Sequence, residues 1–447
     1  MARGLTRYTS LLGLGFGDCG KGLFTDYFCH VDEVHTVVRF NGGAQAGHNV
    51  VRPDGRHHTF SQFGAGSFNP GVITVLASPV VVHPTGILAE NLHLRRAGVV
   101  DAMSRLRIDA RCKVTTPFHQ AAGRLREWAR GAQAHGSCGV GVGETVRQAL
   151  MRPSMTLHYG DLPNRARTLE KLEALRVALC KEFRDATPWQ GAAIVEREIL
   201  EDDQMAARWL HALQPCIVQS PPTERTLIGD QLAQPGDVVF EGAQGVLLDE
   251  WRGFHPHTTW STISTQAVDM VLEDLGVDAQ VRHLGVLRTY LTRHGAGPFP
   301  TADVALDSLE EPHNADVGWQ GRFRRGHPDE VLLRYALKSI GRLEGLLVSH
   351  LDAVGAPTGL RWCRSYGTQD MRSIVTDLPW HHQPDLAHQQ ALTALLQTVT
   401  PQYEQHRIAS PAHWIERVEA ISRSPVLLGA FGPTHDDVRK LSIQPQT

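Results

Sequence analysis

Short apolar runs recur along the chain and are separated by longer polar segments. The runs are rich in Val, Ile and Leu, which is typical of buried strands. Residues 167–186 and 329–343 show helical spacing of their apolar positions. Strands that alternate with helices predict an α/β fold, in which helices surround a large, mainly parallel central sheet and ligands bind at the carboxyl ends of the strands. The seven predicted strands are 9–15, 36–40, 71–76, 79–83, 237–243, 285–291 and 345–351.

The chain has no internal repeat, low-complexity segment or long linker. Its 447 residues are enough for one large α/β core. Glycine-rich loops recur from residue 13 to residue 433, so a site built from them uses the whole length. We therefore expect residues 1–447 to form a single domain.

Composition narrows the class of partner. The formal net charge is −3, which favours a small-molecule ligand over nucleic acid.

Seven cysteines without a CxxC pair predict reduced thiols and a cytoplasmic location. The first residues lack the pattern of a signal peptide. The longest apolar stretch, 71–88, is interrupted by Pro79, His83 and Pro84, so we expect no membrane span.

The first glycine-rich loop, GFGDCGKG from Gly15 to Gly22, joins a predicted strand to a predicted helix. Backbone N–H groups in such a loop bind phosphate, and Lys21 would add a positive charge. The P-loop pattern fails at Gly22, where Ser or Thr would hold Mg²⁺. Asp18 would repel phosphate unless a cation lay between them. Two interpretations stay open: a phosphate loop whose metal is bound by Asp18, or a structural turn.

Two further loops follow predicted strands and carry polar side chains. The loop at 39–50 contains Gln45 and His48, and His48 can protonate a leaving oxygen. The carbonyl of Gly47 can contact a metal. The loop at 240–251 carries Glu241 and Gln244. These loops favour a binding site over an isolated turn.

Two later loops are basic. Arg293 lies in the glycine- and proline-rich loop 292–301, and Arg322, Arg324 and Arg325 lie beside glycines in 318–326. Guanidinium groups at such spacing suit a carboxylate or a phosphate, and the alternative is a solvated surface.

The order and spacing of these motifs resemble the adenylosuccinate synthetase family over nearly the whole chain. The resemblance implies a single-domain α/β fold with a P-loop-like phosphate loop, usually as a homodimer. It also implies an Mg²⁺-dependent ligase that joins L-aspartate to C6 of IMP, through a 6-phosphoryl intermediate, with GTP hydrolysis. The matching stretches are GDCGKG, RFNGGAQAGH, FEGAQGVLLD, TRHGAGPFPT, GRFRRG, LRYALKSI, Leu351–Asp352 and Gly432–Pro433.

The resemblance assigns the catalytic roles. Asp18 matches the base that takes the purine N1 proton and also contacts Mg²⁺, which implies that the role of the missing Ser or Thr passes to Asp18. His48 matches the acid on the phosphate side, and Lys21 holds the phosphates. The carbonyl of Gly47 matches the other metal contact.

The resemblance also assigns binding roles. For the purine substrate it implies Gln45, Ser137, Cys138, Arg152, Gln244, Thr259 and Arg322; for the amino acid, Gln320, Arg322 and Arg324; and for the nucleoside triphosphate, Gly17, Gly20, Lys21, Gly22, Arg324, His350, Asp352, Gly432 and Pro433. Asp352 matches the residue that reads guanine. The family places an arginine from the neighbouring subunit in the purine site, and Arg147 and Arg152 are both candidates.

The chain departs from the family pattern mainly at binding positions. Asp18, Lys21 and His48 are all kept, which favours a changed substrate over a lost activity. The departures are Cys19 for a carboxylate, Gln45 for Asn, Asn49 for Thr, Ser137–Cys138 for two threonines in loop 136–143, Trp319–Gln320 for two more threonines, and His350 for the Lys beside the guanine-reading Asp.

Four functional alternatives therefore stay open. An IMP-dependent ligase is favoured because Asp18 is kept, whereas the related phage-type synthetases that act on (d)GMP typically lose this Asp. The second alternative is such a (d)GMP or ATP-using enzyme that makes 2-aminoadenylosuccinate. The third is a secondary-metabolism relative with another amino donor, suggested by Trp319–Gln320. The fourth is a non-catalytic nucleotide-binding regulatory protein.

Overall fold

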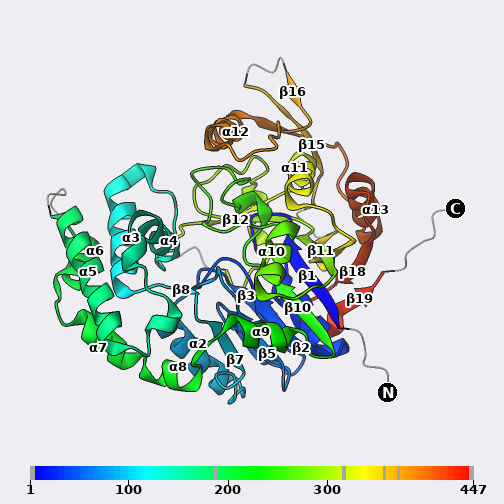
Figure 1. The fold of residues 1–447 in the computed structure, drawn as a ribbon. Coiled ribbons are helices and arrows are strands. Elements are labelled where there is room, and N and C mark those ends of the chain that lie inside the picture. The colour runs from blue at the N-terminus through cyan, green and yellow to red at the C-terminus, as the bar shows by residue number, and fades with distance from the viewer. Residues whose placement is uncertain (1–5, 185–189, 315–318, 356–358, 370–372, 442–447) are drawn as a thin grey trace.

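A ten-stranded sheet forms the centre of the molecule (Figure 1). The structure is a computed structural model that describes residues 6–184, 190–314, 319–355, 359–369 and 373–441. All neighbouring strands are parallel except β18 and β19, which form an antiparallel pair at one edge of the sheet. In sheet order the strands are β19 (Val438–Lys440), β18 (Val426–Ala430), β14 (Gly345–Ser349), β11 (Val281–Arg288), β1 (Arg7–Gly13), β10 (Asp237–Glu241), β2 (Val34–Arg39), β5 (Ile73–Leu76), β7 (Leu106–Asp109) and β9 (Pro222–Thr223).

Helices cover both faces of this sheet and form a lobe at one end (Figure 1). They are α1 (Lys21–Val31), α2 (Pro84–Arg96), α3 (Pro117–Arg130), α4 (Val142–Met151), α5 (Arg165–Phe183), α6 (Ala192–Glu201), α7 (Met205–Ala212), α8 (Gln214–Gln219), α9 (Arg225–Leu232), α10 (Thr265–Leu275), α11 (Glu330–Ile340), α12 (Leu386–Thr398) and α13 (Pro411–Ser422).

The apolar runs are continuous because the central strands are buried on both faces. Successive side chains of a strand point to opposite faces. Leu12 and Phe240 pack into the core that α9 and α10 cover. Leu11 and Val239 pack into a different core with α1. Each central strand therefore contributes apolar side chains to two layers.

Nine short strands lie outside the central sheet. The buried strand expected at 79–83 is confirmed in shortened form as β6, but it pairs with β8 outside the central sheet. In the described residues, the strands outside the central sheet pair as follows: β3 (His48–Val51) with β4 (His57–Phe60), β6 (Val81–Val82) with β8 (Lys113–Val114), β12 (Leu291–His294) with β13 (Phe323–Gly326), and β15 (Cys363–Gly367) with β16 (Ile374–Val375) and β17 (Thr400–Tyr403).

The other six predicted strands are confirmed in the central sheet, as β1, β2, β5, β10, β11 and β14. The two predicted helices are confirmed as α5 and α11. Residues 185 and 186 of the first predicted helix lie outside the described residues.

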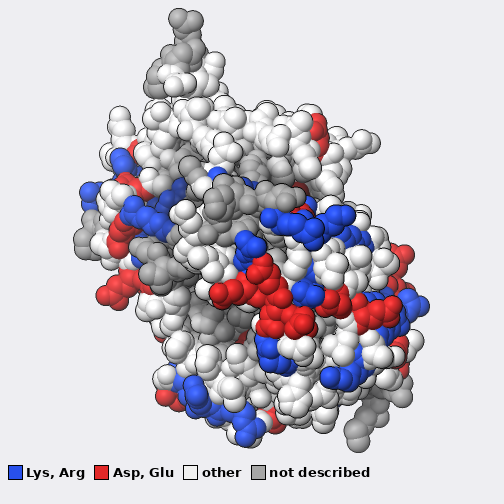
Figure 2. Space-filling view, turned by 90° about the vertical axis from the view of Figure 1, so that its left-hand side faces the viewer, with Lys and Arg blue, Asp and Glu red and all other residues white. Residues whose placement is uncertain are grey.

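The helical lobe presents a face on which basic and acidic side chains alternate (Figure 2). Arg126 on α3 pairs with Glu182 on α5 at 2.6 Å, and Arg124 pairs with Glu196 on α6 at 2.8 Å. Such pairs leave no broad field of one sign on this face. In the described part of the chain, no helix combines the length and the apolarity that a membrane crossing needs.

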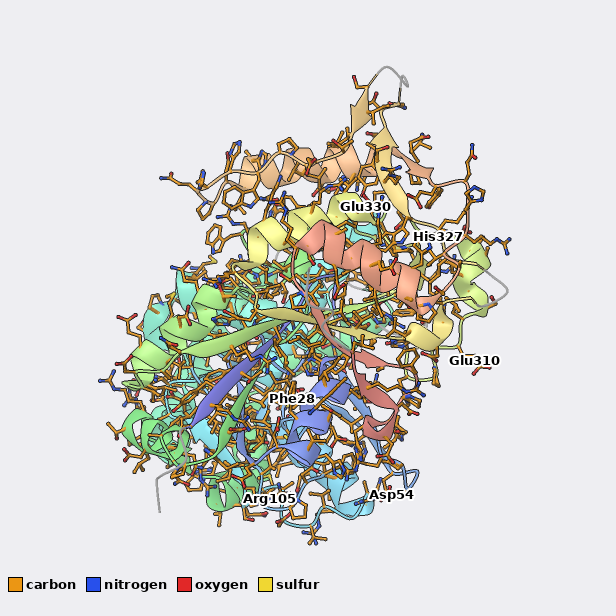
Figure 3. The ribbon with its side chains drawn as sticks, turned by 90° about the vertical axis from the view of Figure 1, so that its right-hand side faces the viewer. Phe28, Asp54, Arg105, Glu310, His327 and Glu330 are labelled. Atoms are coloured by element: carbon orange, nitrogen blue, oxygen red, sulfur yellow. The ribbon has the colours of Figure 1, made fainter. Side chains whose placement is uncertain are left out.

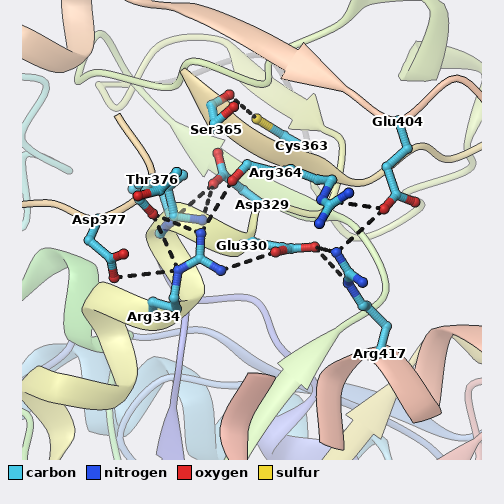
Figure 4. Close-up of polar contacts among 12 residues, drawn as sticks. Asp329, Glu330, Arg334, Cys363, Arg364, Ser365, Thr376, Asp377, Glu404 and Arg417 are labelled. Atoms are coloured by element: carbon cyan, nitrogen blue, oxygen red, sulfur yellow. Dashed lines mark hydrogen bonds and ion pairs between the residues drawn. The ribbon is translucent and has the colours of Figure 1, made fainter. Parts of the chain in front are cut away.

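Glu330 links α11 to α13 on the opposite side of the molecule (Figures 3 and 4). Its carboxylate is buried and accepts a hydrogen bond from Arg417 Nε on α13 at 2.7 Å. Arg334 donates to its other oxygen at 3.0 Å. Arg417 also lies 3.4 Å from Glu404, which in turn lies 3.6 Å from the exposed Arg364.

We expect Arg417→Ala to destabilise the fold by about 1–3 kcal/mol, because it leaves the buried Glu330 carboxylate with fewer donors. Chemical unfolding of Arg417→Ala and of a control variant, Arg364→Ala, measures the free energy of unfolding of each. Arg364→Ala is the matched control, since its exposed pair with Glu404 contributes at most about 1 kcal/mol. Equal stability losses in the two variants would contradict this role for Glu330.

Candidate active site

Six motif loops meet at the carboxyl edge of the central sheet. They follow β18, β14, β11, β1, β10 and β2, which are neighbours in this order and run parallel. Parallel strands bring their carboxyl ends to one edge, so loops that are distant in sequence become adjacent. From one end to the other they carry residues 432–433, 350–352, 293–294, 17–21, 241–244 and 45–48.

The loop after β1 is held against the loop after β10. Lys21 Nζ donates a hydrogen bond to the carbonyl oxygen of Gln244 at 2.6 Å. A Cβ atom at Gly245 would lie 2.2 Å from the carbonyl oxygen of Gly15, so only glycine fits there. Asp18 and Gln244 both have positive φ, of 44° and 51°. Two non-glycine residues in this strained region mark the joint as a functional site.

Gly22 shows why the P-loop hydroxyl is absent. The first turn of α1 packs against β3, and a Cβ atom at position 22 would lie 2.6 Å from the carbonyl oxygen of Asn49. It would also lie 3.1 Å from the backbone of His48. Serine or threonine cannot occupy this position without moving β3. The close approach of β3 brings His48 next to the loop.

Asp18 is paired with His294, the last residue of β12. His294 Nε2 lies 3.5 Å from Asp18 Oδ2. Burial favours the neutral carboxyl, but the hydrogen bond and charge of His294, together with Arg288 and Lys21, hold the pKa of Asp18 below its ordinary value. Asp18 is therefore a carboxylate at neutral pH and can accept a proton or bind a cation.

His48 is oriented by Glu241, and both side chains are buried. Its Nδ1 donates to Glu241 Oε1 at 2.6 Å, and Glu241 Oε2 accepts from the backbone N–H of Ala65 at 3.0 Å. His48 Nε2 has no protein partner within the described residues. Burial lowers the pKa of His48 to about 4, although Glu241 opposes this. Nε2 is thus the ring position left to contact a ligand.

A cavity of about 790 Å³ lies between this edge and the helical lobe. Gln244 lines it, and both polar atoms of its buried amide lack a partner in the described part of the protein. Gln45 Nε2 donates to Thr259 Oγ1 at 3.2 Å, while its own Oε1 is unpartnered there. Unpartnered buried amides fit a ligand that both donates and accepts hydrogen bonds. Of the predicted residues, Gly17, Asp18, Lys21, Gln45, Gly47, His48, Ser137, Cys138, Gln244, Thr259 and Gln320 line the cavity.

Loop 136–143 borders the cavity and is held by Glu127 on α3. The backbone N–H groups of Gly136 and Ser137 donate to Glu127 Oε2 at 3.0 and 3.2 Å. Arg130 donates to the other oxygen of this carboxylate. Glu127 thus occupies backbone donors of a loop whose Ser137 and Cys138 the family resemblance assigns to the purine substrate.

Several predicted residues lie away from this cavity. Arg322 pairs with Asp307 at 2.5 Å, and Arg324 donates to the carbonyl oxygen of Gly297 at 2.7 Å. Arg152 donates to Gln148 and lies 3.7 Å from Glu182, whereas Arg147 lines the cavity.

The predicted base-reading residues lie on the other side of the phosphate loop. Ser349 Oγ donates to the carbonyl oxygen of Cys19 at 3.0 Å, which places the residues after β14 beside this loop. Burial, followed by the charge of Asp437, raises the pKa of Asp352. Burial lowers the pKa of His350 well below its ordinary value, so a neutral imidazole replaces the expected lysine. Gly432 packs on Asp437, and Pro433 follows it.

Comparison with known proteins agrees with this arrangement. The profile of the adenylosuccinate synthetase family matches residues 10–438. The adenylosuccinate synthetase of Thioalkalivibrio sulfidiphilus (strain HL-EbGR7) is 33% identical over 377 residues, 83% of each chain. That of Myxococcus xanthus (strain DK1622) is 30% identical over 434 residues, 94% of this chain and 95% of the relative. This chain belongs to the adenylosuccinate synthetase family.

Members of the adenylosuccinate synthetase family are ligases of purine biosynthesis that form C–N bonds. The fold is similar to the fully ligated adenylosuccinate synthetase of Plasmodium falciparum, with a TM-score of 0.80, 18% identity, and coverage of 98% of this chain and all of the other. The succinoaminodeoxyadenylate synthetase of cyanophage S-2L, bound to dGMP and dATP, has a TM-score of 0.60 and 18% identity, with 98% of this chain and 95% of that one covered.

Within this adenylosuccinate synthetase-family site, sequence reasoning missed the roles of three residues. Glu241 was visible in its motif, but its partner His48 lies 193 residues away. In the loop 292–301, the sequence analysis singled out Arg293 as the basic residue, but the neighbouring His294 contacts Asp18. Glu127 lies in no motif, and only the folded loop reveals its role. Their signal is spatial, since each acts on a residue that belongs to another element or loop.

We expect Gly22→Ala to lower the free energy of unfolding by about 1–3 kcal/mol, because its Cβ would overlap the Asn49 carbonyl. It should also weaken nucleoside triphosphate binding by displacing Lys21. Gly15→Ala is the matched control in the same loop, since its Cβ would make an ordinary 3.6 Å contact with Leu291. Denaturant unfolding and nucleotide titration of both variants measure this, and equal effects would refute the close packing of α1 on β3.

Proposed function

We propose that this chain joins L-aspartate to C6 of a 6-oxopurine nucleotide, with IMP as acceptor and GTP as phosphoryl donor. It is proposed to require Mg²⁺ and to work in the cytoplasm as a homodimer. Family membership supports the ligase class. The choice of IMP, aspartate and GTP rests on the site residues.

The order of the loops along the sheet edge carries this proposal. The proposed base-reading residues, Asp352 and the Gly432–Pro433 turn, lie at one end, followed by the phosphate loop with Lys21. The cavity with Gln45 and Gln244 lies at the other end. A γ-phosphoryl donor and an acceptor purine bound in this order would meet at Asp18 and His48.

Phosphoryl transfer is the proposed first step. The Asp18 carboxylate takes the N1 proton of the purine, and the electron pair moves to O6. O6 then forms a bond to the γ-phosphorus as the bond to the β,γ-bridging oxygen breaks and GDP leaves. His48 donates a hydrogen bond from Nε2 to phosphoryl oxygens once their negative charge favours the imidazolium. Lys21 holds the same phosphates by charge.

Substitution at C6 is the proposed second step. The aspartate amine bonds to C6 and loses one proton, the C6–O6 bond breaks, and O6 leaves as part of inorganic phosphate, which takes up that proton and is a better leaving group than oxide. Gln320, Arg322 and Arg324 are proposed to bind the aspartate carboxylates. Asp18 and the carbonyl of Gly47 line one cavity and offer the oxygen ligands that Mg²⁺ prefers. Mg²⁺ would neutralise charge on the transferred phosphoryl group.

A substrate matrix tests this function. Purified protein with aspartate and Mg²⁺ is given IMP, dIMP, GMP or dGMP, each with GTP or ATP, and phosphate release and product mass are followed. We expect an aspartyl adduct with IMP and GTP, and Asp18→Ala should reduce turnover at least about 10²-fold with nucleotide binding retained. An adduct only with GMP or dGMP, or only with ATP, would overturn the substrate assignment. Full activity in Asp18→Ala would overturn the mechanism.

His294→Asn should move the acidic limb of the pH profile of kcat/KM to higher pH. His294 helps to hold the pKa of Asp18 down, so its loss raises this pKa and the carboxylate becomes protonated, and inactive as a base, at higher pH. Activity should therefore fall more at pH 6 than at pH 8. His135→Asn, another cavity-lining histidine, is the control, and an unchanged acidic limb in His294→Asn would contradict the proposed pairing.

A further inference from the structure

Two histidines and an aspartate gather where α1 meets the segment after β18. They are His30, near the end of α1, and His435 and Asp436, in the single turn His435–Asp437. One candidate ligand atom from each residue lies within 4.8 Å of the others. In the described chain, no other group of three His, Cys, Asp or Glu side chains meets this spacing. Phe28, two residues before His30, marks this part of α1 in Figure 3.

His435 is fixed in the way that metal-binding histidines are fixed. Its Nδ1 donates to Asp26 Oδ2 at 2.7 Å, and both side chains are buried. The other oxygen of Asp26 accepts from Arg52 at 2.8 Å and from Asn69 at 3.0 Å, so the carboxylate is held rigidly. A carboxylate on one ring nitrogen fixes the tautomer and leaves the other nitrogen as the ligand atom. That atom here is Nε2.

The spacing of the outward atoms fits a small divalent ion. His435 Nε2 lies 3.6 Å from Asp436 Oδ1. Two ligands in a tetrahedral site with bonds of about 2.0–2.1 Å lie about 3.3–3.5 Å apart. The His30 ring stacks on His435 with centroids 4.1 Å apart, and because His30 is exposed its ring can turn to present a nitrogen to the same point.

We propose that His30, His435 and Asp436 bind a divalent transition-metal ion such as Zn²⁺. Two imidazoles and one carboxylate favour such an ion over Mg²⁺, which prefers oxygen ligands. This site is separate from the proposed Mg²⁺ contacts at Asp18 and Gly47, and it does not depend on the proposed reaction.

The bound ion would join two segments that carry the proposed nucleotide site. α1 begins at Lys21, in the phosphate loop, and the turn at His435 follows Gly432 and Pro433 directly. Without a metal, the His435–Asp26 hydrogen bond and the stacking of His30 on His435 join α1 to this turn. A metal ligated from both segments would add a link and would raise the stability of the fold by an amount that grows with the logarithm of the metal concentration above the Kd.

Titration with Co²⁺ tests this site. A Co²⁺ ion bound by few nitrogen and oxygen ligands absorbs visible light more strongly than the hydrated ion, so binding can be followed by absorbance. We expect the wild-type chain to bind one more Co²⁺ than His30→Ala or Asp436→Asn, with an absorption band that Zn²⁺ displaces. Zn²⁺ should also raise the Tm of the wild type more than that of either variant. Both substitutions are at exposed side chains, so the variants should fold.

His388→Ala is the matched control. His388 stacks on His381 at 3.9 Å near Asp385, which resembles the proposed cluster, but Asp385 is occupied as the cap of α12. We expect this variant to bind Co²⁺ as the wild type does. Equal Co²⁺ stoichiometry in the wild type, His30→Ala and Asp436→Asn, or loss of the band only in His388→Ala, would overturn the proposal.

Discussion

The close backbone approach of two loops and the strand β3 at the carboxyl edge of the sheet is the constraint on which the site depends. At Gly245 and Gly22 a single added carbon would overlap a carbonyl oxygen of another segment. Because these positions are glycine, the loops after β1 and β10 and the strand β3 can touch. Lys21, Gln244 and His48, which come from three separate parts of the chain, are thereby brought to one cavity. A serine at position 22 would separate α1 from β3.

Titratable side chains at this edge are arranged in pairs that set their protonation. Asp18 faces His294, and His48 faces Glu241. The first pair keeps the Asp18 carboxyl ionised, and the second fixes His48 so that its Nε2 is left to contact a ligand. The site thus has one group suited to accept a proton and one suited to contact a phosphoryl group. The His48–Glu241 pair is buried and the Asp18–His294 pair is half-buried, so the orientation of His48 follows from the fold and not from a ligand.

Sequence patterns predict the parts of this molecule that depend on local chemistry. Continuous apolar runs identify six central strands because those strands are buried on both faces, and the glycine motifs identify the loops that follow them. The pairing of the two-residue strand β6 outside the central sheet was not predicted, because a buried run does not reveal which sheet it joins. His294, Glu241 and Glu127 were missed as partners because each acts through the fold on a residue outside its own motif. The order of the loops along the sheet edge follows from the order of the strands in the sheet, and the spacing of apolar residues in the sequence does not reveal that order.

The most direct measurement follows the C6 oxygen of the acceptor. IMP labelled with ¹⁸O at C6 is incubated with the protein, GTP, aspartate and Mg²⁺, and the released phosphate is analysed by mass spectrometry. If O6 is phosphorylated before the amine displaces it, each phosphate formed with product carries one ¹⁸O. If turnover yields the aspartyl product with unlabelled phosphate, O6 leaves by another route, and the proposed roles of Asp18 and His48 are wrong.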